Sequence, residues 1–155
     1  IYPVPNPSLP FLGVHFTKLI KGGVEAGPNA VLALAREGYK WQMINFKELY
    51  ESLSYIGLQK FILKYPLVTS SEILRSLFKP IFVKSLQRLI PDIKGHMLSS
   101  GNTGIRAQLI NTQGNLEQDF DIRIKDNIVL ILNAPSPAAT SALSISEYVV
   151  DMITR

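Results

Sequence analysis

The stretch DIRIKDNIVLIL, residues 121–132, holds two aliphatic runs separated by an Asp–Asn pair. Runs of this kind favour β-strands, and a two-residue polar turn is typical of the connection between antiparallel strands. The stretch therefore predicts a β-hairpin, with strands at residues 121–125 and 128–132. Adjacent antiparallel strands favour an α+β fold over an alternating β–α arrangement with a parallel sheet.

Further strand signals lie on the N-terminal side of this hairpin. Residues 12–18 alternate roughly as a strand, Lys-Gly-Gly at 21–23 marks a tight turn, and residues 24–27 give a second short strand. Residues 103–112 predict another strand, closed by the turn Gln-Gly-Asn at 113–115. The β segments thus occupy both halves of the chain.

Between them, the segment at about residues 45–90 changes from strand-like to helical periodicity. Asn45 can cap a helix whose third position is Glu48. A serine at residues 70–71 is predicted to open a second helix, and Pro80 to interrupt it before a third helical stretch. This segment is a helical insert between β segments.

The chain closes with a predicted helix at residues 138–153, which follows the proline-rich loop at residues 133–137. Together the elements predict an α+β fold: a mostly antiparallel sheet with an inserted helical segment and a C-terminal helix. At 155 residues the chain is about one domain in length.

The composition is that of a globular chain, since 46% of the residues are hydrophobic and 18% are charged. The apolar runs at residues 30–35 and 128–132 are much shorter than the roughly 20 residues of a membrane-spanning helix. The absence of Cys excludes disulfides, thiolate metal sites and cysteine nucleophiles, and it favours a reducing compartment. We expect a cytoplasmic location, with peripheral contact to the inner face of a membrane as a second expectation.

The net charge of +4 is unevenly distributed, because residues 60–94 contain seven basic and two acidic residues. Such a patch could meet nucleic acid, anionic lipid or an acidic partner, whereas the simpler interpretation is a solvated helix surface. RNA-binding patterns of interleaved aromatic and basic residues are absent, and no nucleic-acid partner is expected. With only two His and no Cys, we expect no protein-bound catalytic metal.

Arg106 is the first residue that could carry chemistry. It lies among apolar residues of a predicted strand, where a charge is costly to bury without an anionic partner. Its planar guanidinium suits a carboxylate in bidentate fashion. A structural carboxylate or solvent could equally satisfy it.

The junction between the proline-rich loop and the last helix is the second candidate. A helix that starts with small residues exposes unpaired N–H groups, and these act together with the helix dipole to favour negative charge. The third candidate is His15, whose neutral imidazole can accept a proton from a hydroxyl group. The simpler interpretations are an ordinary proline-led helix start and a satisfied strand histidine.

These three features lie in contexts that resemble the L-2-hydroxyglutarate oxidases and dehydrogenases. The matching stretches are YPVP at 2–5, PFLGVHFT at 10–17, GPNAVLA at 27–33, REGY at 36–39, GIRAQ at 104–108 and NAPSPAATS at 133–141. The resemblance covers nearly the whole chain, and the helical insert is its least diagnostic part. The wider group is that of the D-amino-acid oxidase-like flavoproteins.

The resemblance implies a role for each candidate. Arg106, in a G-[I/L]-R strand, would hold the substrate carboxylate over the flavin, and His15 would take the hydroxyl proton. Asn133 is a weaker candidate for a substrate contact. The last helix would aim its N-terminus at the pyrimidine edge of the flavin and stabilise negative charge there. The flavin-facing residues implied in this way are Ser136, Pro137, Ala138, Ala139, Thr140 and Ser141.

The family binds the ADP part of FAD with an N-terminal Rossmann unit, and the glycine fingerprint of that unit is absent from this sequence. We therefore expect a substrate-binding portion that holds FAD fully only together with a complementary Rossmann-containing part, and that is inactive alone. The complete enzyme is expected to oxidise L-2-hydroxyglutarate, or a similar 2-hydroxyacid, to the 2-oxoacid. The alternative is a non-catalytic binding domain or a fragment of a split flavoprotein gene.

Overall fold

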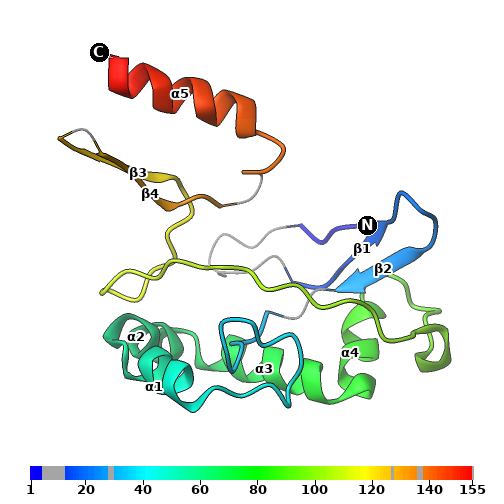
Figure 1. The fold of residues 1–155 in the computed structure, drawn as a ribbon. Helices are drawn as coiled ribbons and strands as arrows, with labels where there is room; N and C mark the ends of the chain where they lie inside the picture. Colours follow the sequence, from blue (N-terminus) through cyan, green and yellow to red (C-terminus); the bar gives the residue numbers. More distant parts are fainter. Residues whose placement is uncertain (5–12, 28–29, 127, 136–137, 155) are drawn as a thin grey trace.

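The structure is a computed structural model that describes residues 1–4, 13–27, 30–126, 128–135 and 138–154. Helices α1 to α4 form one layer, and the extended segment at residues 101–109 runs across this layer (Figure 1). The β3–β4 hairpin and α5 (Ala142–Thr154) lie on the other side of that segment, and the β1–β2 hairpin lies beside it. The α+β class with antiparallel strands is confirmed, although the strands of the described residues form two separate two-stranded sheets.

The first sheet pairs β1 (His15–Lys18) with β2 (Val24–Gly27). The strands are antiparallel with His15 opposite Gly27, and the intervening glycines Gly22 and Gly23 both take positive φ angles. Because such angles suit residues without a Cβ atom, the Lys-Gly-Gly sequence makes the tight turn that was predicted. The N-terminal residue extends this sheet on the other side of β1. The Ile1 amine donates to the Phe16 carbonyl at 2.7 Å, and the Phe16 N–H donates back to the Ile1 carbonyl at 2.8 Å.

The helical insert is present and contains four helices within the described residues, and a short 3-10 helix follows it. Asn45 caps the first helix as predicted, since its side chain accepts hydrogen bonds from the Lys47 and Glu48 N–H groups. Successive helices are separated by the single residues Tyr55, Tyr65 and Phe78. The elements are α1 (Phe46–Ser54), α2 (Ile56–Lys64), α3 (Pro66–Leu77), α4 (Lys79–Leu86) and η1 (Gly95–Met97).

The predicted start of the second helix at Ser70 or Ser71 is wrong. Helix α3 begins four residues earlier at Pro66, where the missing N–H costs nothing because the first turn has no intrahelical acceptors for it. The two serines lie inside the helix, and their hydroxyls donate to the Leu67 and Val68 carbonyls. Serine hydroxyls can bond back to the preceding turn in this way, so a serine does not always mark a helix start.

The second sheet is the hairpin predicted from residues 121–132. Strand β3 (Asp121–Lys125) pairs antiparallel with β4 (Ile128–Asn133), and the register shifts between Asp121 and Ile122. Asp126 takes a φ of 53° in the turn, a conformation that Asp tolerates better than most residues.

The strand predicted at residues 103–112 is wrong over most of its length. Only Ile110 makes a β-bridge, to Leu116, while residues 101–109 form no regular element. The predicted turn at residues 113–115 is present, with Gly114 at a φ of 81°. A strand is stable only when a neighbour satisfies its N–H and C=O groups, and among the described residues no strand pairs with this segment.

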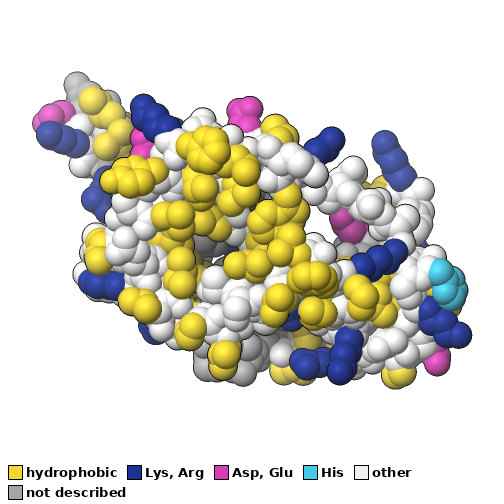
Figure 2. Space-filling view, turned by 90° about the horizontal axis from the view of Figure 1, so that it is seen from below, with side chains coloured by type: hydrophobic (Ala, Val, Ile, Leu, Met, Phe, Trp, Pro, Cys, Tyr) yellow, Lys and Arg dark blue, Asp and Glu magenta, His cyan; other side chains and the backbone are white. Residues whose placement is uncertain are grey.

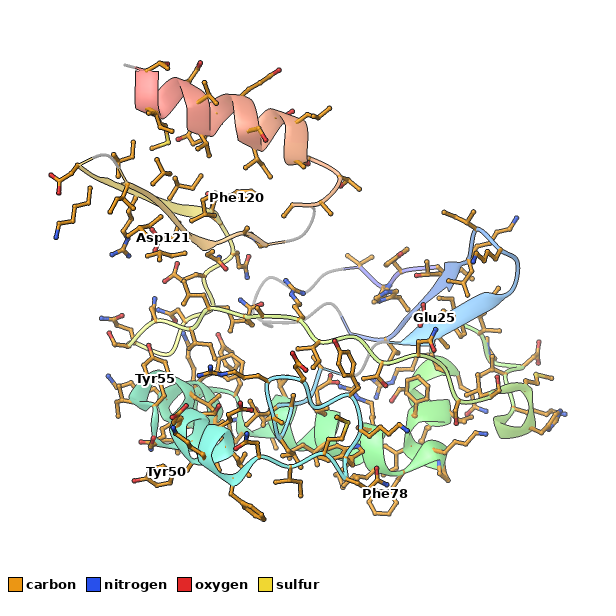
Figure 3. The ribbon with its side chains drawn as sticks, in the orientation of Figure 1. Glu25, Tyr50, Tyr55, Phe78, Phe120 and Asp121 are labelled. Atoms are coloured by element: carbon orange, nitrogen blue, oxygen red, sulfur yellow. The ribbon has the colours of Figure 1, made fainter. Side chains whose placement is uncertain are left out.

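A small core joins β1 to α4. Val14, Phe16 and Leu86 are buried against one another, and Phe82 and Leu89 are partly buried around them. The whole chain nevertheless exposes 11925 Å², whereas a folded monomer of 17.3 kDa exposes about 7,800 Å². Figure 2 shows hydrophobic side chains gathered over the helical face, with Lys and Arg around them. Tyr50 and Phe78 project outward from this layer (Figure 3).

Candidate functional site

His15 lies on β1, between the buried residues Val14 and Phe16 that face the core. Its own side chain is half-buried and emerges on the opposite face of the strand, because successive side chains alternate. The His15 ring stacks on the Tyr2 ring with centroids 4.5 Å apart, and its Nδ1 lies 3.2 Å from the Gly13 carbonyl oxygen. The histidine is therefore held in position while part of its ring remains accessible.

Arg106 lies on the extended segment at residues 101–109 and is exposed. Among the described residues, no carboxylate lies within ion-pair distance of its guanidinium. The structural carboxylate that could have explained this arginine is thus not found in the described part of the chain. Water or a bound anion can satisfy the hydrogen-bond donors of an exposed guanidinium.

Arg75, in contrast, is an arginine with a structural role, because a carboxylate of the same helix pairs with it. It forms an ion pair with Glu72 one turn earlier on α3, and both side chains are largely removed from solvent. Glu72 also accepts a hydrogen bond from the Ala30 N–H at 3.1 Å, and so fastens residue 30 to α3. Burial raises the pKa of Glu72 above its ordinary value of 4.5, against the opposing effects of Arg75 and the Ala30 N–H. Sequence reasoning missed this pair, although its i, i+3 spacing on a helix was a usable signal.

The turn at residues 110–116 fixes one end of the Arg106 segment to α2. The Tyr55 hydroxyl donates to the Ile110 carbonyl at 2.8 Å, and the Lys60 ammonium donates to the Thr112 carbonyl at 3.0 Å. Lys64 adds a third contact, to the Asn115 side-chain oxygen at 2.8 Å. The insert therefore positions the residues that follow Arg106, and two lysines of the basic segment at 60–94 serve this contact.

Asn133 ends β4 and is buried, with 9% of its surface exposed. Its Nδ2 group donates to the Asp119 carbonyl at 2.7 Å and to the Glu117 carbonyl at 3.3 Å. These bonds close the end of the hairpin on the segment that leads into β3. Asn133 thus has a structural role here, and its contact with substrate stays a prediction.

The start of the last helix differs from the prediction. Helix α5 spans Ala142–Thr154, and residues 138–141 form turns before it, with the Ala138 N–H donating to the Pro135 carbonyl at 3.0 Å. The first helical hydrogen bond runs from the Ile145 N–H to the Ser141 carbonyl, so Ser141 is the N-cap position. The prolines and small residues allow a turn to precede the helix, and the helix N-terminus lies four residues later than predicted. Of the proposed flavin-facing residues, Ser136 and Pro137 lie outside the described residues.

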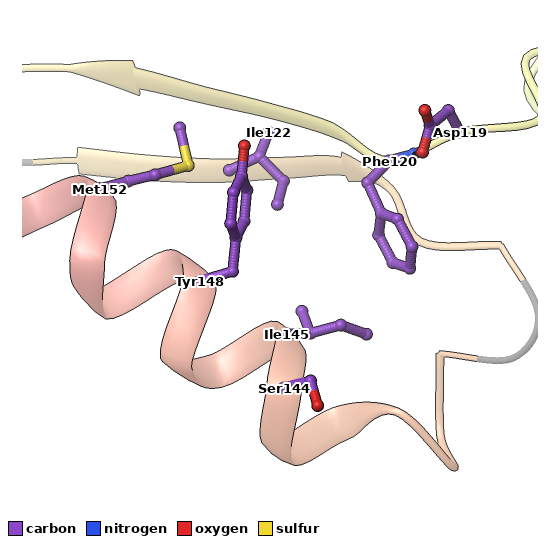
Figure 4. A pocket seen from close by; sticks show the side chains of 7 residues that line it. All are labelled: Asp119, Phe120, Ile122, Ser144, Ile145, Tyr148 and Met152. Atoms are coloured by element: carbon purple, nitrogen blue, oxygen red, sulfur yellow. Dashed lines mark hydrogen bonds between the residues drawn. The ribbon is translucent and has the colours of Figure 1, made fainter.

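An apolar cavity of about 390 Å³ lies between β3 and α5 (Figure 4). Ile145, Tyr148 and Met152 of α5 point across it toward Phe120 and Ile122. Asp119 and Ser144 complete the lining, which includes no Lys, Arg or His among the described residues. An anionic dicarboxylate needs cationic or multiple N–H partners, so this cavity does not suit a 2-hydroxy diacid.

A second, open cavity of about 490 Å³ lies at the opposite part of the fold, beside α4 and η1. Neither this cavity nor the one against α5 is lined by His15, Arg106 or Asn133. In the described residues, no group of three or more His, Asp and Glu side chains could hold a metal ion. Each helix in the described part of the chain is too short or too polar to cross a bilayer.

Comparison with known proteins gives a consistent result. No protein-family model matches the chain. The chain is 54% identical to the L-2-hydroxyglutarate dehydrogenase of Indibacter alkaliphilus, over 97% of its own length and 38% of that protein. It is 45% identical to the mitochondrial L-2-hydroxyglutarate dehydrogenase of Caenorhabditis briggsae, over 100% of the chain and 37% of the relative. It is 37% identical to the L-2-hydroxyglutarate dehydrogenase of Escherichia coli K12, over 99% of the chain and 36% of that relative.

These relatives are oxidoreductases by name, and the similarity extends along the whole chain. The chain is similar along nearly its whole length to L-2-hydroxyglutarate dehydrogenases, and it spans a little over a third of the length of these relatives. The family resemblance inferred from the sequence stretches around His15, Arg106 and Asn133 is thereby confirmed.

Proposed function

We propose that this chain is the substrate-facing and flavin-facing portion of an FAD-dependent enzyme that oxidises L-2-hydroxyglutarate, or a similar 2-hydroxyacid, to the 2-oxoacid. The observation that carries the proposal is the 54% identity to an L-2-hydroxyglutarate dehydrogenase across 97% of the chain. Identity at this level over nearly every residue favours a shared function as well as a shared fold.

The oxidation removes a proton from the hydroxyl group of the substrate and a hydride from its C2 atom. FAD, when bound, would supply the acceptor for the hydride. His15 would take the hydroxyl proton on a ring nitrogen, and its half-buried ring is accessible enough to meet a substrate. Arg106 would hold the carboxylate beside C2, and its exposed guanidinium lacks a carboxylate partner among the described residues.

The start of α5 fits the pyrimidine edge of a flavin in part. The first N–H groups of a helix lack intrahelical acceptors, and the positive end of the helix dipole favours the negative charge of a reduced ring. In α5 these groups belong to residues 142–144, directly after Ser141. The Ala138 N–H is already bonded to the Pro135 carbonyl, so Ala138 would face the ring without donating to it.

We further propose that a complementary part containing a Rossmann unit binds the ADP moiety, either in the same polypeptide or as a separate chain. The chain exposes about one and a half times the surface expected for a folded monomer of its mass. Many large hydrophobic side chains are part of this exposed surface, and such side chains are typical of a surface that another folded part covers. The exposed surface therefore supports the proposal that the chain functions only after it has assembled with the complementary part.

The experiment that tests the proposal combines this chain with the remaining part of the enzyme. FAD binding is measured by titration, and oxidation of L-2-hydroxyglutarate is followed with an artificial electron acceptor. We expect tight FAD binding and turnover from the assembly, and weak binding without turnover from the chain alone. An assembly that binds FAD but oxidises neither L-2-hydroxyglutarate nor other 2-hydroxyacids would favour the alternative of a non-catalytic binding domain.

Location and membrane contact stay predictions. Several lysines of the basic segment at residues 60–94 are engaged within the chain: Lys60 and Lys64 hold the 110–116 turn, and Lys79 donates to the Leu98 carbonyl at 2.7 Å. Fewer cationic side chains are therefore available to bind anionic lipid than the sequence suggested. Flotation with anionic vesicles, repeated at high salt, tests the membrane contact, because screening should release a protein held by charge.

A further inference from the structure

The ring of Tyr2 lies directly on the imidazole of His15. The ring centroids are 4.5 Å apart and the planes are inclined by 23°, which is a stacked arrangement. The reciprocal hydrogen bonds between Ile1 and Phe16 explain this geometry, since they set Ile1 opposite Phe16 in an antiparallel pair. The next pair along this ladder is Tyr2 opposite His15, on the face of the sheet away from the core.

The hydroxyl end of Tyr2 is held as well. Its oxygen lies 3.1 Å from the Thr17 hydroxyl, two residues along β1 from His15. The tyrosine is therefore fixed at the backbone by the ladder and at its tip by Thr17. A ring held at both ends can fix the plane of the imidazole that it covers.

The protonation pattern of the imidazole follows from its other contact. His15 Nδ1 lies 3.2 Å from the Gly13 carbonyl oxygen, and a carbonyl oxygen can only accept a hydrogen bond. In the neutral ring the proton is therefore on Nδ1, and Nε2 carries the lone pair. Gly13 has a φ of 81°, which a residue with a side chain rarely adopts, and this backbone turn brings its carbonyl to the ring.

We propose that Tyr2 is a positioning residue for His15. By stacking on the imidazole, Tyr2 keeps the ring in the plane where Nδ1 donates to Gly13, so that Nε2 stays available to accept a proton from the substrate hydroxyl. This inference rests on the proposed function, in which His15 is the base. It adds a residue to which the sequence motifs assigned no role, and a defined tautomer for the base.

Kinetics of two Tyr2 variants in the intact enzyme provide the first test. Tyr2→Leu removes the aromatic ring, and we expect kcat for L-2-hydroxyglutarate to fall by about 10- to 100-fold, because displacement of a reacting group by about an ångström has effects of this size. KM should change little, since the carboxylate contact is left in place. Tyr2→Phe keeps the stacked ring, and we expect it to retain kcat within about threefold.

Nitrogen-15 spectra of the histidine side chains provide a second test that does not depend on turnover. This chain has only two histidines, so with the nitrogen-15 label confined to this part of the enzyme, His96→Gln removes the signal of the other one. In the wild-type enzyme with a neutral ring, we expect the protonated type of signal for His15 Nδ1 and the unprotonated type for Nε2. Tyr2→Phe should preserve this pattern, and Tyr2→Leu should average the two signals as both tautomers become populated.

The outcomes separate this inference from the proposed function. A proton on Nε2 in the wild-type enzyme overturns the inference. A Tyr2→Leu enzyme with wild-type kcat and an unchanged tautomer overturns it as well. His15→Asn tests the proposed role of the base, because it keeps a donor toward Gly13 and removes Nε2. If His15→Asn retains full activity, the role of His15 as base fails, even where the spectra still show Tyr2 fixing the ring.

Discussion

At the scale of single residues, the structure separates arginines and carboxylates that look alike in the sequence. Arg75 is partly buried and pairs with the buried Glu72, which joins α3 to residue 30, whereas Arg106 is exposed on a segment without regular structure. A charge that the chain already neutralises has little to offer a ligand, and one left accessible can bind an anion. This difference supports Arg106 as the substrate-binding arginine.

Arg106→Ala in the intact enzyme should reduce kcat/KM for L-2-hydroxyglutarate by roughly 30- to 1,000-fold, which corresponds to about 2–4 kcal/mol. The expected loss is large because the substrate carboxylate would be left without its cation. Arg36→Ala is the matched control, since Arg36 is an exposed arginine whose guanidinium lies 3.5 Å from the Glu51 carboxylate. The proposal for Arg106 is contradicted if both variants have the same steady-state kinetics as the wild type.

Glu72 gives a prediction for the dependence of stability on pH. Its pKa is raised in the folded state by burial, so its contribution to stability is fully present below its ordinary pKa of 4.5 and is lost as the pH rises through the raised value. The free energy of unfolding of the wild type, minus that of Glu72→Gln, should therefore decrease as the pH rises from about 4 to 8. Urea denaturation at several pH values measures this difference. An increase with pH would contradict the raised pKa, and Glu25→Gln at an exposed site serves as the control.

At the scale of elements, helix α2 acts as the support for the segment that carries Arg106. Gly57 lies buried on the face of α2 where the Asn111 carbonyl and the Tyr55 ring approach the backbone, and a Cβ atom there would collide with both. Glycine is costly within a helix because it has the greatest backbone freedom to lose. Its presence in α2 is explained by the close approach of the 110–116 turn.

Gly57→Ala should therefore destabilise the protein, by about 1–3 kcal/mol, despite the higher helix propensity of alanine. The added methyl group would push the 110–116 turn away from α2, and amide exchange in that turn should become faster. Gly101→Ala is the control, because a Cβ atom at Gly101 meets no neighbour within 4 Å. Thermal unfolding together with hydrogen exchange checks the prediction, which equal stability of the two variants would refute.

At the scale of the whole molecule, the chain buries little of its apolar surface. Val14, Phe16, Phe61 and Leu86 are the buried hydrophobic side chains among the described residues, while many large ones on the helices, on β4 and on α5 are exposed. The cavity between β3 and α5 is lined largely by apolar side chains. Such surfaces stabilise a protein only when a partner covers them.

The chain alone should therefore bind a dye for exposed apolar surface, such as ANS, strongly. Addition of the remaining part of the enzyme should reduce the dye signal and raise the melting temperature, because a partner that binds only the folded state stabilises it. An unrelated Rossmann domain at the same concentration is the control. A dye signal and melting temperature that do not respond to the complementary part would argue against an assembly that buries this surface.

Much of the local structure could be predicted from the sequence. The hairpin at residues 121–132, the Lys-Gly-Gly turn and the Asn45 cap depend on residues close together in the chain, and all three are present. The strand at residues 103–112 and the helix start at residue 138 were predicted wrongly. Strand formation at 103–112 depends on a neighbour that local sequence does not specify, and small residues after proline are compatible with a turn as well as with a helix.

The family resemblance, the α+β class and the choice of His15 and Arg106 as candidates could all be read from the residue order, because they depend on residue types in short contiguous stretches. The folded chain was needed to show that Glu72 pairs with Arg75, that Asn133 closes a hairpin, and that Tyr2 lies on His15. The Tyr2 contact arises because Ile1 pairs with Phe16, 15 positions further along the chain, and this register sets Tyr2 opposite His15. Registers and pairings of this kind are set by packing and by hydrogen bonds between distant segments, so the order of residues along the chain does not reveal them.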